Sequence, residues 1–356
     1  MSAAIPRINA IATATPAAEC NGGYAEWARG QLTDPREARL LERMLHRSGI
    51  DTRYSVLTGF DTALGSGSFY NRGHDPGTGE RMAVYAREAP ELALSAIAAL
   101  PDISGITHLV VASCTGFIAP GIDQIIARRL GLPPTVERTL IGFMGCYAGV
   151  TALRSAAHIV RSDPAARVLV LSVELCTLHM QQTGRLDRLM AMAQFADGAA
   201  AALVTASGPG LALGDGLSLT LADSEDLITW TIGDTGFAME LSGEVPARLA
   251  ETLADDAVAA RIGTPAQIAA WAVHPGGRSI LDAVERTLHL PEDRLAPSRA
   301  VLQSCGNMSS ATVLFVLQQI IPQRPASGIA LAFGPGLAME GLRFGWTSGE
   351  SSDDAG

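Results

Sequence analysis

The chain has 356 residues, 47% of them hydrophobic and 17% charged, so it is long enough for two domains or one large duplicated domain with a substantial buried core. Its net charge of −10 and the lack of any basic block argue against nucleic acid as a partner, and no apolar run approaches the roughly 20 residues that would span a membrane. Five cysteines, odd in number and without a disulfide spacing, are typical of reduced thiols in the cytoplasm.

The N-terminal segment, residues 1–16, predicts a first β-strand rather than a signal peptide, because no charged start precedes a continuous apolar core. A helix is predicted to begin at Pro35, since Asp34 is a good N-cap and proline suits the first helical position. Residues 57–80 are glycine-rich and aperiodic, which indicates a long surface loop or the edge of a lid.

Strands and helices then alternate along the chain, which favours a layered α/β architecture. Apolar runs typical of buried strands lie at residues 107–117, 166–179, 198–207, 268–277 and 328–336. Helical patterns lie at residues 89–100, 150–162, 278–290 and 309–321. The tail, residues 347–356, is predicted to be disordered.

All 26 basic residues are arginine. The lack of lysine excludes lysine Schiff bases, pyridoxal phosphate enzymes and lysine-dependent phosphate loops. No zinc-binding spacing such as C-x-x-C or H-E-x-x-H occurs, and neither does the G-x-S-x-G motif of serine hydrolases. Covalent chemistry would therefore fall mainly to cysteine.

One cysteine lies in an unusual setting: Cys146, in the sequence "GFMGCYAGV", directly follows Gly145. The apolar residues that come next, from Val150 to Val160, recur with the period of one buried helix face. The thiol is therefore predicted to lie just before, or within, the first turn of a helix, where unpaired N–H groups and the helix dipole favour a thiolate. A buried structural thiol is the alternative, because free cysteine is often buried.

Two further residues could act with this thiol. His274 is predicted to end a strand in "AAWAVHPGG", and it could supply the cation or hydrogen-bond donor that a nucleophilic thiolate needs. Asn307 lies in a turn before a helix, in "CGNMSSATVLF". For Asn307 a helix cap or an Asx turn is the alternative role.

Taken together, "GFMGCYAG", "WAVHPGGRSILD" and "CGNMSSATVLFVL" resemble the Cys, His and Asn motifs of the type III polyketide synthases, the chalcone synthase-like family. The segments "ASCTGFIAPGID", "QFADGAAAALV" and "AFGPGLAMEGLRF" extend the resemblance over nearly the whole chain. It implies the thiolase fold, a duplicated α/β architecture of two αβαβα halves, normally in a homodimer. Residues 1–210 would form the half with the nucleophilic cysteine, and residues 211–346 the half with the histidine and the asparagine.

The resemblance also implies a reaction that uses no metal, nicotinamide or flavin. Cys146 would accept an acyl group from an acyl-CoA starter, and His274 would keep the Cys146 thiolate nucleophilic below the ordinary pKa of a thiol. His274 and Asn307 would then donate hydrogen bonds to the thioester oxygen of malonyl-CoA and stabilise the enolate that forms when CO₂ leaves. Repeated extension and cyclisation would give a small aromatic or pyrone polyketide.

Five residues are implied to line the substrate cavity. Phe195 matches a phenylalanine that stands between the CoA tunnel and the cavity in relatives, although a core aromatic is an equal alternative. Met239, two residues after Phe237, stands where plant chalcone synthases have phenylalanine, and this departure argues against aromatic starters. Cys114 stands where plant enzymes commonly have threonine and bacterial naphthalene-forming relatives have cysteine. A packing role for Cys114 stays open, and the small residues beside it, such as Thr115, leave room for a longer acyl starter.

Coenzyme A carries phosphates, so an acidic protein needs a local cationic entrance for it. In the helix that begins at Pro35, Arg39, Arg43 and Arg47 recur every four residues along one face. Arg43 and Arg47 match positions that contact CoA in the family, and Arg278, just after the histidine motif, is a further candidate. A solvated face paired with Glu37 and Glu42 is the alternative.

Three other functions stay open. An initiating ketoacyl-ACP synthase also uses Cys, His and Asn, but depends on a carrier protein and has different motifs. A Cys-His-Asn thioester hydrolase would release a free acid and never form a carbon–carbon bond. A non-catalytic partner protein on the same fold is disfavoured by the intact set of three residues.

Overall fold

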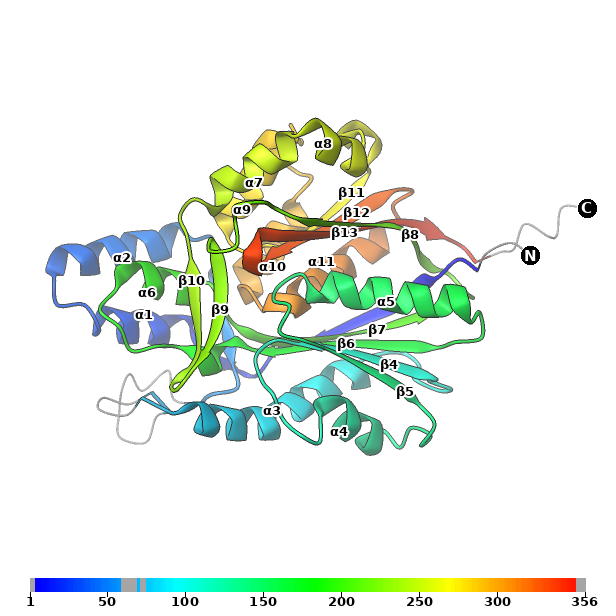
Figure 1. Cartoon of the computed structure of the whole chain (residues 1–356), viewed down its shortest axis with the longest axis horizontal. Coiled ribbons are helices and arrows are strands. Elements are labelled where there is room, and N and C mark those ends of the chain that lie inside the picture. Colours follow the sequence, from blue (N-terminus) through cyan, green and yellow to red (C-terminus); the bar gives the residue numbers. More distant parts are fainter. Residues whose placement is uncertain (1–3, 59–68, 71–74, 350–356) are drawn as a thin grey trace, which may run out of the picture.

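The computed structural model describes residues 4–58, 69–70 and 75–349. Its largest element is a nine-stranded sheet in the order β11-β12-β13-β8-β1-β7-β6-β4-β5 (Figure 1). The strands of this sheet are β1 (Arg7–Ala14), β4 (His108–Ser113), β5 (Glu137–Gly142), β6 (Val168–Leu175), β7 (Asp197–Thr205), β8 (Gly210–Thr220), β11 (Ala270–Val273), β12 (Gly328–Gly334) and β13 (Ala338–Thr347). Two smaller sheets pair β2 (Ala18–Glu19) with β3 (Tyr54–Ser55), and β9 (Ile228–Gly233) with β10 (Gly236–Leu241).

The large sheet consists of two parts that meet at one corner. β1 pairs with β7 over most of its length, but with β8 only at Arg7↔Ala212 and Ile8↔Leu211. As a result, β5-β4-β6-β7-β1 forms one layer and β8-β13-β12-β11 forms another (Figure 1).

Helices separate and cover these two layers. They are α1 (Asn21–Arg29), α2 (Pro35–Arg47), α3 (Thr78–Ala98), α4 (Ile122–Arg129), α5 (Ala148–Ser162), α6 (Leu186–Met192), α7 (Val245–Ala254), α8 (Asp256–Ile262), α9 (Arg278–Thr287), α10 (Ala296–Cys305) and α11 (Thr312–Ile320). α5 contacts β4, β6 and β13, and α11 contacts β1, β7 and β11, so both helices lie between the layers. α3 and α4 cover the outer face of the layer that contains β4, β6 and β7, and α7 and α9 cover the outer face of the layer that contains β11, β12 and β13 (Figure 1). The predicted layered α/β architecture is confirmed.

The strands next to the central helices are buried on both faces. β6, β7 and β12 are buried along their whole length, as their continuous apolar sequences predict. The strand predicted for residues 166–179 is shorter, because its last four residues form the 3₁₀ turn Cys176–His179. The predicted N-terminal strand is confirmed as β1.

The helix predicted for residues 89–100 is longer than expected. α3 begins at Thr78 and continues through Pro90, although an internal proline costs a helix one backbone hydrogen bond. Burial of one face of α3 against the sheet, including Tyr85 and Ala93, offsets this cost. Most of the loop predicted at residues 57–80, and most of the tail predicted at 347–356, lies outside the described residues.

Candidate active site

Cys146 lies on a corner between β5 and α5, two residues before the helix begins. Gly145 forms this corner with φ +85°, a conformation that residues with a side chain rarely adopt. A Cβ atom at Gly145 would also lie only 2.2 Å from Cδ of Pro335. Glycine is therefore required before the cysteine for two separate reasons, and the thiol lies just before the helix, as the sequence predicts.

A second glycine brings the cysteine close to the segment that contains Asn307. A Cβ atom at Gly149, in the first turn of α5, would lie 2.2 Å from the backbone oxygen of Ser310. Without a side chain at this position, α5 can approach the 3₁₀ turn Ser309–Ala311 closely. Cys146 and Asn307 therefore line the same cavity, although 161 positions separate them along the chain (307 − 146 = 161).

His274 follows the last residue of β11, and its backbone N–H donates to the carbonyl of Leu331 on β12 at 2.8 Å. Its side chain is 1% exposed, and within the described part of the chain neither ring nitrogen has a hydrogen-bond partner. Burial lowers the pKa of His274 to about 3, because a charged imidazolium would lose its hydration. The ring is thus neutral, with one free donor and one free acceptor.

The side-chain amide of Asn307 has a defined orientation. Its Oδ1 accepts a hydrogen bond from the backbone N–H of Ser309 at 2.8 Å, and its Nδ2 donates to the carbonyl of Gly276 at 3.3 Å. The backbone of Asn307 pairs with the segment around Phe195, through bonds of 2.8 Å to Gln194 and 2.9 Å from Ala196. The N–H₂ group therefore faces the cavity as a donor.

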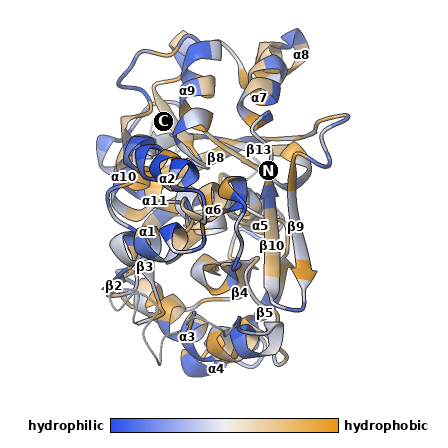
Figure 2. Cartoon of the chain, turned by 90° about the vertical axis from the view of Figure 1, so that its left-hand side faces the viewer, coloured by the Kyte–Doolittle hydropathy of each residue, from blue (hydrophilic) through white to orange (hydrophobic). Residues whose placement is uncertain are grey.

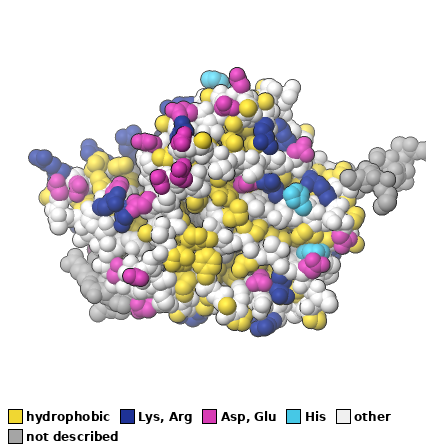
Figure 3. All heavy atoms as spheres, in the orientation of Figure 1, with side chains coloured by type: hydrophobic (Ala, Val, Ile, Leu, Met, Phe, Trp, Pro, Cys, Tyr) yellow, Lys and Arg dark blue, Asp and Glu magenta, His cyan; other side chains and the backbone are white. Residues whose placement is uncertain are grey.

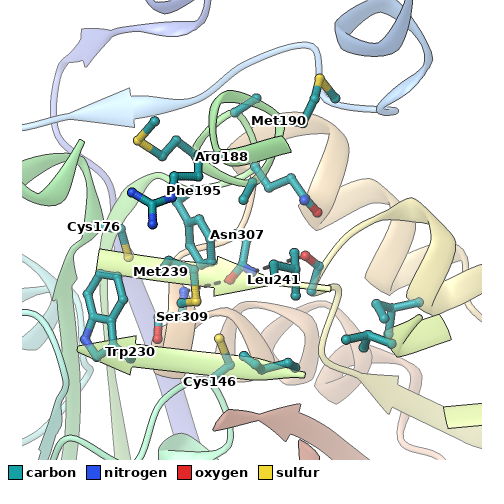
Figure 4. A pocket seen from close by; sticks show the side chains of 18 of the residues that line it. Cys146, Cys176, Arg188, Met190, Phe195, Trp230, Met239, Leu241, Asn307 and Ser309 are labelled. Carbon is teal, nitrogen blue, oxygen red and sulfur yellow. Dashed lines mark hydrogen bonds between the residues drawn. The ribbon is translucent and has the colours of Figure 1, made fainter. Parts of the chain in front are cut away.

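These residues line one cavity of about 950 Å³. Cys146, His274 and Asn307 all border it, and Figure 4 shows the Cys146 thiol below the Asn307 amide. Four of the residues proposed from the sequence for the cavity wall also border it: Cys114, Thr115, Phe195 and Met239. Phe237 does not border the cavity. It is 1% exposed and lies behind the wall, stacked on His179.

The Cys146 thiol differs from the sequence expectation in its acidity. Burial raises its pKa to about 11, and hydrogen bonds from Ser309 and Asn307 only partly offset this, while the nearby Glu174 carboxylate raises it further. The helix position predicted a thiolate, and the family resemblance implied that His274 would stabilise it. Desolvation outweighs the effect of the helix, so Cys146 and His274 are both neutral at pH 7.

This acidity predicts how the free enzyme reacts with alkylating agents. A pKa of about 11 leaves about one Cys146 side chain in ten thousand ionised at pH 7. We expect the rate of Cys146 labelling by iodoacetamide to rise about tenfold per pH unit from pH 7 to 10, measured by mass spectrometry of the labelled peptide. A rate that is already constant below pH 8 would instead indicate a preformed thiolate–imidazolium pair.

Cys114 supports the corner that carries Cys146. The backbone N–H of Gly145 donates to the Cys114 sulfur at 3.0 Å, and the Cys114 thiol lies 3.6 Å from the Gly145 carbonyl. Burial and the charge of Glu174 raise the pKa of Cys114 well above its ordinary value. Cys114 is thus a neutral packing side chain that also accepts a hydrogen bond.

Sequence reasoning missed a buried carboxyl group beside the site. Glu174 accepts hydrogen bonds from the Cys114 N–H at 2.9 Å, the Thr115 hydroxyl at 2.8 Å and the Ser310 hydroxyl. Burial raises its pKa to about 7. A glutamate within the apolar run "VLVLSVEL" was the available signal, since acidic residues are almost never fully buried without partners.

The arginines proposed for CoA lie at and near the mouth of this cavity. Arg47, in the last turn of α2, and Arg278, the first residue of α9, both border it, and Arg278 Nη1 donates to the Arg47 carbonyl at 3.3 Å. Arg43 is exposed one turn earlier on α2, outside the cavity lining. α2 is mostly hydrophilic (Figure 2), and its Asp34 cap accepts from the Arg36 N–H at 2.7 Å. Glu42 pairs with Arg29 at 3.6 Å.

The described residues contain neither a metal-binding cluster nor a membrane-spanning helix. No group of three or more His, Cys, Asp and Glu side chains in this part of the chain could hold a metal ion. In the same residues, every helix is too short or too polar to cross a membrane.

Comparison with known proteins shows the family of this chain. A family model described as the N-terminal domain of chalcone and stilbene synthases matches residues 8–209, and the model of the C-terminal domain matches residues 216–345. The chain belongs to the chalcone and stilbene synthase family. It is therefore a type III polyketide synthase, an acyltransferase in the same class as its bacterial relatives.

Two bacterial relatives can be aligned with most of the sequence of this polyketide synthase. The alpha-pyrone synthesis polyketide synthase-like Pks18 of Mycobacterium tuberculosis is 32% identical, over 95% of this chain and 90% of its own length. The 1,3,6,8-tetrahydroxynaphthalene synthase of Streptomyces peucetius is 33% identical, over 88% of this chain and 85% of its own length.

Solved structures confirm the thiolase fold of this polyketide synthase. The crystal structure of PKS-I from the brown alga Ectocarpus siliculosus matches with a TM-score of 0.88 and 29% identity, over 98% of this chain and 100% of that one. The C-terminal type III polyketide synthase domain of Steely1 from Dictyostelium matches with a TM-score of 0.85 and 25% identity, over 96% and 99%.

Proposed function

We propose that this enzyme loads an acyl group from acyl-CoA onto Cys146 and extends it with malonyl-CoA. The observation that carries the proposal is one cavity in which a buried thiol, an unpaired neutral imidazole and an oriented amide donor come together. Each group has a separate task in this chemistry, and the chain brings them from three distant segments.

In the loading step, the Cys146 sulfur attacks the carbonyl carbon of the acyl-CoA thioester. A free ring nitrogen of His274 accepts the thiol proton as the new C–S bond forms, and the imidazolium then protonates the departing CoA thiolate. The products are an acylated Cys146 and free CoA. A neutral thiol and a neutral imidazole that border the same cavity suit this step, because a proton needs to move only when the thioester is present.

In the extension step, malonyl-CoA loses CO₂ and its bonding electrons become an enolate. His274 and Asn307 each have an N–H group available for the enolate oxygen, and such a donor is worth about 3–4 kcal/mol. The enolate carbon attacks the acyl-Cys146 thioester, the new carbon–carbon bond forms, and the Cys146 thiolate leaves. After the extended chain returns to Cys146 and the cycle repeats, cyclisation gives a small aromatic or pyrone product.

The proposal is tested by supplying CoA thioesters without any carrier protein. We expect acyl-CoA to add the mass of its acyl group to the intact enzyme, and malonyl-CoA then to yield cyclised products detected by mass spectrometry. Free acid as the sole product would identify a hydrolase, and a strict need for an acyl carrier protein would identify a ketoacyl-ACP synthase.

CoA itself would bind at the arginine entrance formed by Arg43, Arg47 and Arg278. We expect the double variant Arg43→Ala/Arg47→Ala to raise the KM for malonyl-CoA while leaving the rate at saturation nearly unchanged, because the lost contacts bind ground and transition states equally. The effect should shrink as salt rises, since these side chains are exposed.

Arg36→Ala, on the exposed first turn of the same helix, is the matched control and should leave KM unchanged. An unchanged KM for the double variant at low salt would exclude α2 from CoA binding and leave Arg278 as the candidate.

We also infer a cytoplasmic homodimer. All five cysteines are free thiols, which suits a reducing compartment. β5 is an edge strand, and the large hydrophobic residues Phe117 and Leu140 are each 45% exposed. Figure 3 shows hydrophobic side chains gathered on one face of the molecule. Light scattering should give twice the 37.1 kDa of one chain, and a monomer mass would contradict this inference.

A further inference from the structure

Arg53 is a fully buried arginine to which the reaction above gives no role. It lies between α2 and β3 and is 1% exposed. Its Nη2 has no hydrogen-bond partner in the described part of the chain. A buried charge costs free energy unless its polar atoms are paired, so Arg53 is poorly suited to a purely stabilising role. The hydrogen bonds that its Nη1 makes are directed at main-chain carbonyls beside the catalytic centre.

These carbonyls belong to a segment that borders the cavity. Arg53 Nη1 donates to the carbonyl of Phe195 at 2.6 Å and to that of Met192 at 3.4 Å. Residues 192–195 connect α6 with β7, and all four border the cavity. A hydrogen bond from a charged donor is roughly twice as strong as one between neutral groups. The guanidinium therefore holds both ends of this segment.

The backbone of Asn307 pairs with this segment and with the residue after it. The Asn307 N–H donates to the Gln194 carbonyl at 2.8 Å, and the Asn307 carbonyl accepts from the Ala196 N–H at 2.9 Å. Gly306, directly before Asn307, has φ +70°, and a Cβ atom there would lie 2.8 Å from Cγ of Arg53. Arg53 therefore supports the Asn307 backbone in two ways, through the paired segment and through its own stem against Gly306.

Arg53 is itself held by α1. Its Nε donates to Oδ1 of Asn21 at 3.0 Å, and its guanidinium carbon lies 4.6 Å from the centre of the Tyr24 ring, a cation–π contact. The Tyr24 hydroxyl donates to the carbonyl of Leu189 in α6 at 2.5 Å, so the ring that packs on Arg53 also joins α1 to α6. The guanidinium therefore has a fixed place relative to the segment that it holds.

We propose that Arg53 is a positioning residue, which fixes the Asn307 backbone and thereby aims the Asn307 N–H₂ group at the enolate oxygen of malonyl-CoA. The inference rests on the proposed polyketide reaction. Arg53 is not one of the residues that border the cavity, so it acts through Asn307 rather than on the substrate. Its contribution belongs to the decarboxylation step, because a donor stabilises an enolate only at the correct distance and angle.

The first test is Arg53→Met, which keeps a similar length and removes the hydrogen-bond donors. We expect kcat for malonyl-CoA decarboxylation to fall about tenfold and KM to stay within about twofold, because a misplaced donor weakens binding of the transition state. The rate at which acyl-CoA acylates Cys146 should stay within about twofold, since Cys146 and His274 lie on other segments. Arg53→Lys can still donate to one carbonyl and should recover part of the lost rate.

A double-mutant cycle with Asn307→Ala shows whether Arg53 acts through the amide. In the Asn307→Ala background, Arg53→Met should cause no further loss of decarboxylation, because the donor that Arg53 positions is already absent. A general defect of the fold would lower the rate by the same factor in both backgrounds. That outcome, or a loss of acylation as large as the loss of decarboxylation, would overturn the inference.

Arg161→Met is the matched control. Arg161 also donates to two main-chain carbonyls, those of Leu213 and Gly214 at 2.9 and 2.8 Å, but it does not border the cavity or the Asn307 segment. This variant should decarboxylate malonyl-CoA at the original rate.

If Arg53→Met fails to fold, two milder variants take its place in the cycle: Arg53→Lys, and Asn21→Ala, which removes the bond to Arg53 Nε. Each should slow decarboxylation about threefold, and only while Asn307 is present. An unchanged rate in all folded variants would overturn the inference. An original enzyme that does not decarboxylate malonyl-CoA would overturn the proposed reaction instead.

Discussion

Cys146→Ala is expected to abolish both acyl-enzyme formation and polyketide synthesis. The sulfur is the only group on this corner that can form a thioester with the starter, and alanine leaves nothing to replace it. Intact-protein mass spectrometry after incubation with acyl-CoA should show no added mass, and no extended product should appear. Decarboxylation of malonyl-CoA should persist at a reduced level, because the donors on His274 and Asn307 are still present.

Cys114→Ser is the matched control for this prediction. A serine hydroxyl can accept the N–H of Gly145 as the Cys114 sulfur does, so the corner that carries Cys146 should be preserved. We expect this variant to acylate normally and to change only the rate or the distribution of products. If Cys114→Ser were as inactive as Cys146→Ala, the assignment of the chain-carrying thiol would be wrong.

The second large effect is expected at the two donors. Asn307→Ala should slow malonyl-CoA decarboxylation about 10²- to 10³-fold, because one of the N–H groups that stabilise the enolate oxygen is lost. Cys146 should still be acylated in this variant, since His274 can still accept its proton. His274→Ala should lose both acylation and decarboxylation. The two steps are measured separately, by intact mass and by release of CO₂.

His274→Gln separates the two tasks of the histidine. Its amide can donate a hydrogen bond but cannot take a proton, so it should retain part of the decarboxylation while failing to acylate Cys146. Normal decarboxylation by Asn307→Ala would contradict the donor role and would leave Asn307 as a turn-forming residue, held by its bond from the Ser309 N–H.

The residues of the site could be predicted from the sequence where local chemistry carries the information. Gly145 and Gly149 surround Cys146 in the sequence, and the structure shows that each is needed for a bend or a close approach. The N-cap at Asp34 and the proline after it likewise predict the start of α2 correctly. In such cases the residues that determine the structure lie within a few positions of one another.

Features that depend on distant contacts could not be predicted in this way. His179 is hydrogen-bonded to the backbone of Thr115 and of Phe237, which lie 64 and 58 positions away in the chain. No local sequence pattern predicts these contacts. The direction of the Cys146 pKa shift depends on how completely tertiary packing removes water from the thiol. In β9, five of the six residues are exposed or half-buried. The β9–β10 hairpin therefore lacks the continuous apolar pattern by which β6 and β7 were identified.

The short parallel bridge between Phe195 and Asn307 holds the Asn307 backbone without using the Phe195 side chain. Residue 195 can therefore be replaced without loss of these hydrogen bonds. Both hydrogen bonds of the bridge use main-chain atoms, the Gln194 carbonyl and the Ala196 N–H, and the Phe195 carbonyl is held by buried Arg53 at 2.6 Å. The side chain at position 195 takes no part in holding the amide. Substitution of the ring that borders the cavity can therefore leave the Asn307 amide in its place.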